Sequence, residues 1–155
     1  MKTKLITALS ILSLASCTTA YKKPDAVNVN VGGFTHHTAD RKGKKDFNEA
    51  HNNIGVEVEK DNYFMNVETM KDSFDNRNQL IAGGYKYCWN EYVCMPLGLG
   101  YFTGYKNVSF IPYSGLEFNV GRFTLRTAFM PPLAVEQGTK TGFFFVGGRF
   151  RVYEF

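Results

Sequence analysis

The sequence predicts an all-β protein, an eight-stranded antiparallel transmembrane β-barrel with short periplasmic turns and longer outer loops. Phe, Tyr and Trp make up 15% of its 155 residues, and together with abundant glycine they favour strands and turns over long helices. From Val27 onward, apolar and polar residues alternate with a period of two, which is the pattern of a two-faced strand. The third observation is the spacing of the turn signals, which gives alternating short and long connections.

Residues 1–20 predict a signal peptide that is not part of the fold. Two lysines precede an apolar run that is too short to span a bilayer. The run ends in the lipobox Leu-Ala-Ser-Cys at residues 14–17, which predicts cleavage before Cys17 and lipidation of that cysteine. The alternative is ordinary cleavage after Ala20. In both cases residues 21–155 are expected to form a single exported barrel domain.

Eight segments carry the alternating pattern of a strand. In chain order they are 27–37, 53–59, 63–70, 80–88, 92–104, 109–119, 122–131 and 141–155. Long connections follow the first, third, fifth and seventh segments, and short ones follow the others. Outer-membrane barrels have this layout, with tight periplasmic turns and longer outer loops.

A soluble eight-stranded barrel of the lipocalin type is the alternative, and it has its polar face outward. The connection lengths and the aromatic C-terminal residues Tyr153 and Phe155 favour the membrane form. Arg149 and Arg151 share strand parity with these two aromatic residues, and a charge that faces lipid is costly. The sequence therefore predicts a bulge in the last strand, or a place for the arginines near the headgroups.

Cys88 and Cys94 flank a turn, so pairing of the adjoining strands would bring them together. In an oxidising, exported compartment they can form a disulfide, and the alternative is two free thiols. No other Cys or His has the spacing of metal ligands, so no metal and no other cofactor is expected. The net charge of +4 comes from scattered basic residues, which argues against a nucleic-acid partner.

Two segments carry the residue types of acyl-transfer chemistry. His36 and His37 close the first predicted strand, and Asp72 and Ser73 open the connection after the third. If the first strand runs toward the outer face, both segments lie at the same rim. Serine can act as nucleophile, histidine as base, and a carboxylate can orient the histidine. An Asp-Ser pair taken alone is more often a turn or a cap.

Six motifs, in their order and spacing, carry a family resemblance. They are Phe34-Thr35-His36-His37, Asp46-Phe47-Asn48-Glu49, Lys71-Asp72-Ser73-Phe74, Ile81-Ala82-Gly83, Leu97-Gly98-Leu99-Gly100 and Phe110-Ile111-Pro112. Over residues 33–155 the chain resembles the PagP family of lipid A palmitoyltransferases, which are outer-membrane barrels.

The resemblance implies an acyltransferase of the bacterial outer membrane, acting as a monomer, that moves a palmitoyl-type chain from a phospholipid donor to lipid A. It implies that His37, Asp72 and Ser73 are the catalytic residues. His36 is the alternative histidine, because strand parity places it, and not His37, on the face of Asn30.

In this family the barrel interior holds the acyl chain, and prolines near the outer rim weaken strand pairing so that lipid enters sideways. Pro112, Pro131 and Pro132 are the candidates here, since proline lacks the N–H donor of a ladder bond. For Pro131 and Pro132 the alternative is that they simply end a strand. Asn48 and Glu49 are expected to brace the outer loop.

The sequence departs from the family at its start. Only residues 21–26 separate the signal from the first strand, where the family has an amphipathic helix, and the first loop is shorter. These departures favour a second hypothesis, a non-catalytic barrel of the same descent that serves as a surface binding or exclusion protein. A third hypothesis is a hydrolase that releases acyl chains to water.

Overall fold

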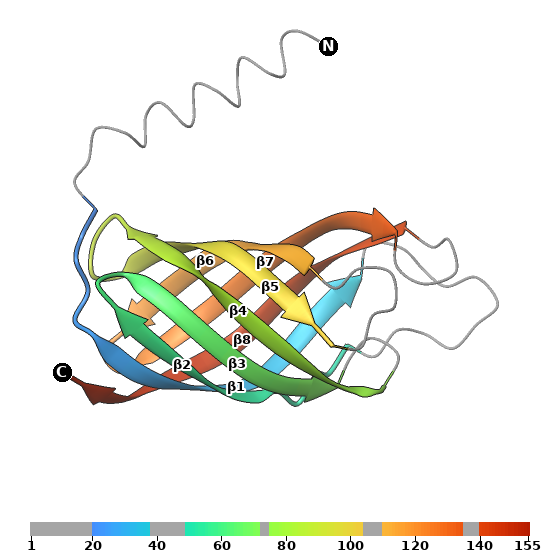
Figure 1. The fold of residues 1–155 in the computed structure, drawn as a ribbon, viewed down its shortest axis with the longest axis horizontal. Coiled ribbons are helices and arrows are strands. Elements are labelled where there is room, and N and C mark those ends of the chain that lie inside the picture. Colours follow the sequence, from blue (N-terminus) through green and yellow to red (C-terminus); the bar gives the residue numbers. More distant parts are fainter. Residues whose placement is uncertain (1–19, 38–48, 72–74, 104–109, 135–139) are drawn as a thin grey trace, which may run out of the picture.

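The computed structural model describes residues 20–37, 49–71, 75–103, 110–134 and 140–155, with the backbone alone for 130–134 and 140–143. These residues form a closed barrel (Figure 1). Its strands are β1 (Ala26–His37), β2 (Ile54–Lys60), β3 (Tyr63–Lys71), β4 (Arg77–Cys88), β5 (Val93–Phe102), β6 (Phe110–Val120), β7 (Phe123–Ala134) and β8 (Lys140–Glu154). Each strand pairs antiparallel with the next, and β8 pairs with β1, which confirms the predicted barrel.

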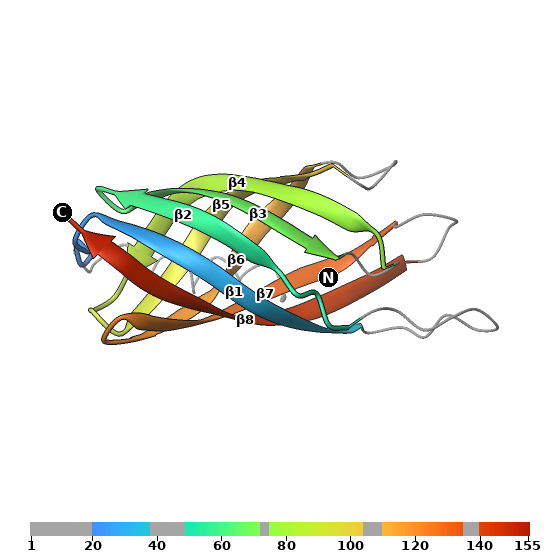
Figure 2. The same cartoon turned by 90° about the horizontal axis from the view of Figure 1, so that it is seen from below.

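The connections define two ends of the barrel (Figure 2). At one end, here called the turn end, the connections are 61–62, 89–92 and 121–122; at the other, the loop end, they are 38–53, 72–76, 103–109 and 135–139. Asp61 and Asn62 have φ values of 51° and 65°, the left-handed conformation that a two-residue hairpin turn requires. No helix among the described residues is long and apolar enough to cross a membrane.

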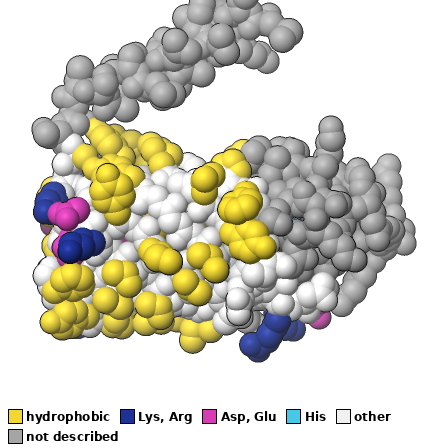
Figure 3. All heavy atoms as spheres, in the orientation of Figure 1, with side chains coloured by type: hydrophobic (Ala, Val, Ile, Leu, Met, Phe, Trp, Pro, Cys, Tyr) yellow, Lys and Arg dark blue, Asp and Glu magenta, His cyan; other side chains and the backbone are white. Residues whose placement is uncertain are grey.

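The outside of the barrel is apolar and much of its interior is polar. Every strand exposes large hydrophobic side chains, among them Val31, Val56, Met65, Ile81, Leu99, Phe118, Leu125 and Phe150. Buried polar side chains include Asn28, Asn30, Glu57, Asn66, Glu68, Lys86 and Arg149. Figure 3 shows one face of the apolar surface, with charged side chains gathered toward its ends. This distribution suits hydrocarbon outside and excludes the lipocalin alternative, which has the opposite polarity.

A bulge in β1 decides which histidine faces the interior. Gly32 has a φ of 63°, and the pairing of β1 with β8 shifts just after Val31. Beyond this point Thr35 and His37 are buried, whereas the side chain of His36 is 73% exposed. The parity argument that placed His36 inward is therefore wrong, because the extra residue of a bulge reverses the alternation.

A second bulge, at Val152 in β8, explains how Arg149 and Tyr153 can face opposite sides of the barrel wall. The pairing of β8 with β1 shifts between Arg151 and Tyr153. Arg149 faces the interior and is 1% exposed, while Tyr153 and Phe155 are 62% and 58% exposed. The predicted bulge is thus present, and it keeps the Arg149 charge away from lipid.

Two strands, β4 and β7, extend three residues further than predicted. β4 begins at Arg77, where it pairs with Lys71 of β3. β7 continues through Pro131 and Pro132 to Ala134, so the alternative that these prolines end the strand is wrong. They lie where the pairing of β7 with β8 shifts register, an irregularity that tolerates a missing N–H donor.

The facing ends of β4 and β5 are joined covalently. Cys88 and Cys94 are direct partners in the strand pairing, both are fully buried, and a disulfide links them. The disulfide alternative of the sequence is therefore the one present in the structure. It closes the hairpin at the turn end of the barrel.

Candidate functional site

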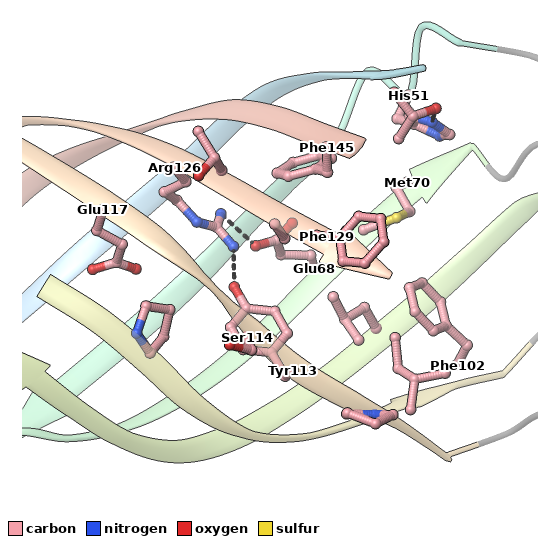
Figure 4. Close-up of a pocket in the computed structure, with 17 residues that line it drawn as sticks. His51, Glu68, Met70, Phe102, Tyr113, Ser114, Glu117, Arg126, Phe129 and Phe145 are labelled. Carbon is pink, nitrogen blue, oxygen red and sulfur yellow. Dashed lines mark hydrogen bonds and ion pairs between the residues drawn. The ribbon is translucent and has the colours of Figure 1, made fainter. Parts of the chain in front are cut away.

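The barrel interior contains an apolar cavity in its loop-end half (Figure 4). Side chains of Met70, Leu80, Phe102, Ile111 and Phe145 form much of its wall. The cavity volume is about 70 Å³. Such a wall favours a hydrocarbon occupant, because a polar ligand would lose its hydrogen bonds there.

Paired polar groups form the floor of this cavity, toward the turn end. Arg126 donates hydrogen bonds to Glu68 and to the hydroxyl of Tyr113, each at 2.7 Å. Glu68 also accepts a hydrogen bond from Asn53 at 2.7 Å. Figure 4 shows Arg126 and Glu117 at this end, opposite His51. A hydrocarbon chain inside the cavity would have to stop at these groups, since displacing them breaks buried ion pairs.

Below the floor, the turn-end half of the interior contains a cluster of charged side chains that includes Glu57, Glu59, Lys86, Glu117 and Arg149. The Nζ atom of Lys86 lies 2.5, 2.9 and 3.1 Å from carboxylate oxygens of Glu57, Glu59 and Glu117. Arg149 contacts Glu57 and binds both carboxylate oxygens of Glu117. All five residues are 2% exposed or less. Burial of so many charges is tolerable only because each has partners of opposite sign.

The barrel wall has a seam between β6 and β7 beside the cavity. Residues 115–120 of β6 pair with 123–128 of β7, but in the described backbone no pairing joins 110–114 to 129–134. The cavity is lined there by Ser114 and Phe129, whose strand positions point them outward, as well as by inward-facing residues. The cavity therefore continues through the wall, toward the surface that faces lipid. This continuity is the geometric basis for lateral access.

Pro112 lies on the β6 edge of this seam. The N–H of Leu116 donates to the Thr127 hydroxyl on β7, whereas the N–H of Asn119 donates toward β5, to the carbonyl of Tyr92. Since alternate residues of a strand point their N–H groups to the same side, position 112 would donate toward β7. Proline has no N–H to donate, so Pro112 cannot form a ladder hydrogen bond to β7 at this position of the seam.

The predicted catalytic residues are only partly described. His37 closes β1 at the loop end, where it is 8% exposed and pairs with Phe143 of β8. Asp72 and Ser73 lie outside the described residues, as do Cys17 and Asn48. The assignment of His37, Asp72 and Ser73 as a catalytic set therefore stays a prediction.

The other predicted loop-end residues form a surface contact. The Nδ1 atom of His36 lies 3.4 Å from a carboxylate oxygen of Glu49, and both side chains are solvent-accessible. The backbone N–H of Thr35 donates to the carbonyl of Glu49. Glu49 thus holds the connection after β1 against that strand.

His51 is a buried residue that the sequence did not single out. Its side chain lies between Thr35 at the end of β1 and Lys71 at the end of β3, and it contacts both. The backbone of His51 also hydrogen-bonds to Gly33 and to Lys71. The ends of β1 and β3 are therefore joined at one rim, as the predicted topology requires. A lone histidine in a connection gives no spacing signal, so the sequence offered no way to find it.

The fold and cavity define a class, an eight-stranded transmembrane β-barrel with an apolar cavity in its interior. Barrels of this kind span the bacterial outer membrane, so the predicted fold class and location are confirmed. No protein-family model and no curated protein match the chain.

Two solved structures are similar to this chain in fold. One comes from work on the de novo design of transmembrane β-barrels, with a TM-score of 0.54 and 13% identity, covering 86% of this chain and 100% of the designed one. The other is the outer membrane protein Ail of Yersinia pestis, determined in a phospholipid bilayer nanodisc. Its TM-score is 0.47 at 16% identity, covering 83% of this chain and 99% of Ail. Identities this low concern the fold alone.

Proposed function

We propose that this barrel is an outer-membrane acyltransferase that takes a palmitoyl-type chain from a phospholipid and transfers it to lipid A. The observation that carries the proposal is the apolar interior cavity together with the unpaired seam between β6 and β7. A lipid tail can pass through such a seam without leaving an apolar environment. In a barrel whose interior is polar throughout, which is usual for this fold, the tail would instead have to pack against ion pairs, and this is energetically unfavourable.

The polarity of the interior supports a measuring role for the cavity. Much of its wall is apolar, and at the floor Arg126 and Glu68 are ion-paired. A tail that enters from the seam would extend until its methyl end meets this pair. The depth of the apolar part would then limit the length of the chain that is transferred.

The chemistry is proposed for the loop end. His37 acts as base, Asp72 orients it, and Ser73 activates the acceptor hydroxyl or takes up the acyl group. The support is that β1 ends at His37 and that Lys71, the residue before Asp72, is tied to β1 through His51. The donor ester and the lipid A hydroxyl would meet at this rim, in the outer leaflet.

Mass spectrometry of lipid A from cells that express the full chain tests this proposal. We expect one additional acyl group per lipid A, and loss of that group in Ser73→Ala. If lipid A is unchanged while folded protein is present in the outer membrane, transferase activity is ruled out. Co-purified phospholipid in that case would favour the non-catalytic binding barrel, and release of free fatty acid would favour a hydrolase.

A further inference from the structure

The cavity contains a second set of acyl-transfer groups, apart from the predicted set at the rim. The side chains of Thr35 and His51 both line the cavity and are 3% and 4% exposed. The Thr35 hydroxyl oxygen lies 2.6 Å from Nε2 of His51. On the other side of the ring, Nδ1 is hydrogen-bonded to the backbone carbonyl of Lys71.

These contacts fix the tautomer of His51. A carbonyl oxygen only accepts hydrogen bonds, so Nδ1 must carry the proton that it donates to Lys71. In the neutral imidazole Nε2 is then unprotonated, and the Thr35 hydroxyl donates to it. A hydroxyl held on an imidazole, with the imidazole oriented by a third group, is the arrangement of an activated nucleophile.

The pair is also in reach of the seam. Thr35 is the direct partner of Phe145 on β8, and Phe145 is the direct partner of Ala128 on β7. Ala128 is the last residue of β7 that pairs with β6. Adjacent strands are about 4.8 Å apart, so Thr35 lies two strand spacings, roughly 10 Å, from the entry to the cavity.

The Thr35–His51 pair also lies at the end of the cavity where the ester group of a bound lipid is expected. Figure 4 shows His51 at the loop end of the cavity with Met70 near it, and Arg126 and Glu117 at the opposite end. A lipid tail whose methyl end lies at the charged floor has its ester end toward the loop end. The ester carbonyl would therefore lie on the side of the cavity where Thr35 and His51 are found.

We infer that Thr35 is the nucleophile that carries the acyl chain and that His51 is its general base; this rests on the proposed acyltransferase function. The Thr35 oxygen attacks the ester carbonyl carbon of the phospholipid while Nε2 of His51 takes the hydroxyl proton. The bond between the carbonyl carbon and the glycerol oxygen breaks, and the departing oxygen takes the proton from Nε2. The products are lysophospholipid and an acyl ester on Thr35.

The second half of the reaction reverses these proton movements. A hydroxyl of lipid A gives its proton to Nε2 and attacks the acyl carbon, and Thr35 regains the proton as its ester bond breaks. Ser73 would then act on the acceptor hydroxyl and would not itself become acylated. Thr35 and His51 thus carry the proton transfers of both halves, and the residues at the rim position lipid A.

The test uses the full-length protein in detergent micelles with phosphatidylcholine as donor, with and without lipid A. Without acceptor, we expect the intact mass of the protein to rise by one acyl group, on the peptide that contains Thr35. Thr35→Val, which keeps the shape and removes the hydroxyl, should lower lysophospholipid release at least 100-fold. Thr35→Ser should retain activity, and His51→Gln, which can still donate to the Lys71 carbonyl, should lose it.

The outcomes separate this inference from the function on which it rests. If the wild-type protein releases no lysophospholipid and leaves lipid A unmodified, the acyltransferase proposal fails and the inference with it. If the wild type modifies lipid A but folded Thr35→Val does so equally well, or the acyl group is found on Ser73, only the inference is overturned. The adduct on the wild-type protein decides the matter even if Thr35→Val does not fold.

Discussion

Arg149 on β8 and Glu117 on β6 form two parallel hydrogen bonds, of 2.8 and 2.6 Å, although β7 lies between their strands in the sheet. Both side chains are 1% exposed. The contact crosses the barrel interior, and through Lys86 and Glu57 it belongs to the charged layer beneath the cavity.

Arg149→Met is expected to destabilise the barrel by about 3–5 kcal/mol, because it leaves buried carboxylates without their partner. The change in stability is measured by urea unfolding in micelles. The folded fraction is determined from the gel mobility shift that folded barrels show on heating. Arg151→Met is the matched control on the same strand, since its ion pair with Glu154 is near the surface and contributes no more than about 1 kcal/mol. Equal losses in the two variants would contradict the assigned role of the layer.

Toward the turn end, the seam stops at Gly115, where β6 and β7 approach each other closely. A Cβ atom at this position would lie 1.8 Å from the carbonyl oxygen of Thr127, whereas at Gly83 it would lie 3.4 Å from its nearest neighbour, the carbonyl oxygen of Phe64. Gly115→Ala should therefore separate the strands and cost about 1–3 kcal/mol, while Gly83→Ala should stay within about 1 kcal/mol of the wild type. The same unfolding experiment compares them, and a stable Gly115→Ala protein would show that the two strands are not held this closely.

Closing the seam should slow the proposed reaction without harming the fold. Pro112→Val restores an N–H that points toward β7, and one new ladder bond of about 1 kcal/mol would reduce the open population about fivefold. We expect acylation of lipid A to fall by a similar factor, with stability unchanged or higher. Pro24→Val, at an exposed position before β1, is the control. Undiminished acylation in Pro112→Val would argue against entry between β6 and β7.

Filling the cavity should change which acyl chains are used. Ala128 lines the cavity beside the seam, and Ala128→Leu adds bulk that a long tail must displace. Donor phospholipids with 12-carbon and 16-carbon chains, supplied separately, measure the effect as a ratio of transfer rates. We expect the 16-carbon rate to fall more, and Val58→Leu on the lipid-facing surface to leave the ratio unchanged. An unchanged ratio in Ala128→Leu would mean that the tail does not occupy this space.

Much of the fold was predictable because strand alternation is a local property. The sequence predicted the eight strands, their alternating connections and the disulfide alternative for Cys88 and Cys94. It placed β7 too short at Pro131 and Pro132, since a proline reads locally as a strand end and only the register with β8 shows that the strand continues. Arg149 needed a bulge whose position depended on its partner strand.

The candidate site was harder to predict, for two physical reasons. The bulge at Gly32 reverses the face of each residue after it, so strand parity assigned His36 and His37 to the wrong sides. His51 gave no pattern at all, because its role comes from contacts with Thr35 and Lys71, which are 16 and 20 residues away.

The sequence by itself determined a β-barrel with membrane character, because alternation and turn spacing are local properties of the chain. The tertiary structure alone decided the inside: which half is apolar, where the wall is left unpaired, and that Thr35 and His51 share a hydrogen bond. Those features arise from register, bulges and contacts across the barrel, which depend on pairs of strands and on closure and so have no counterpart in any single stretch of the chain.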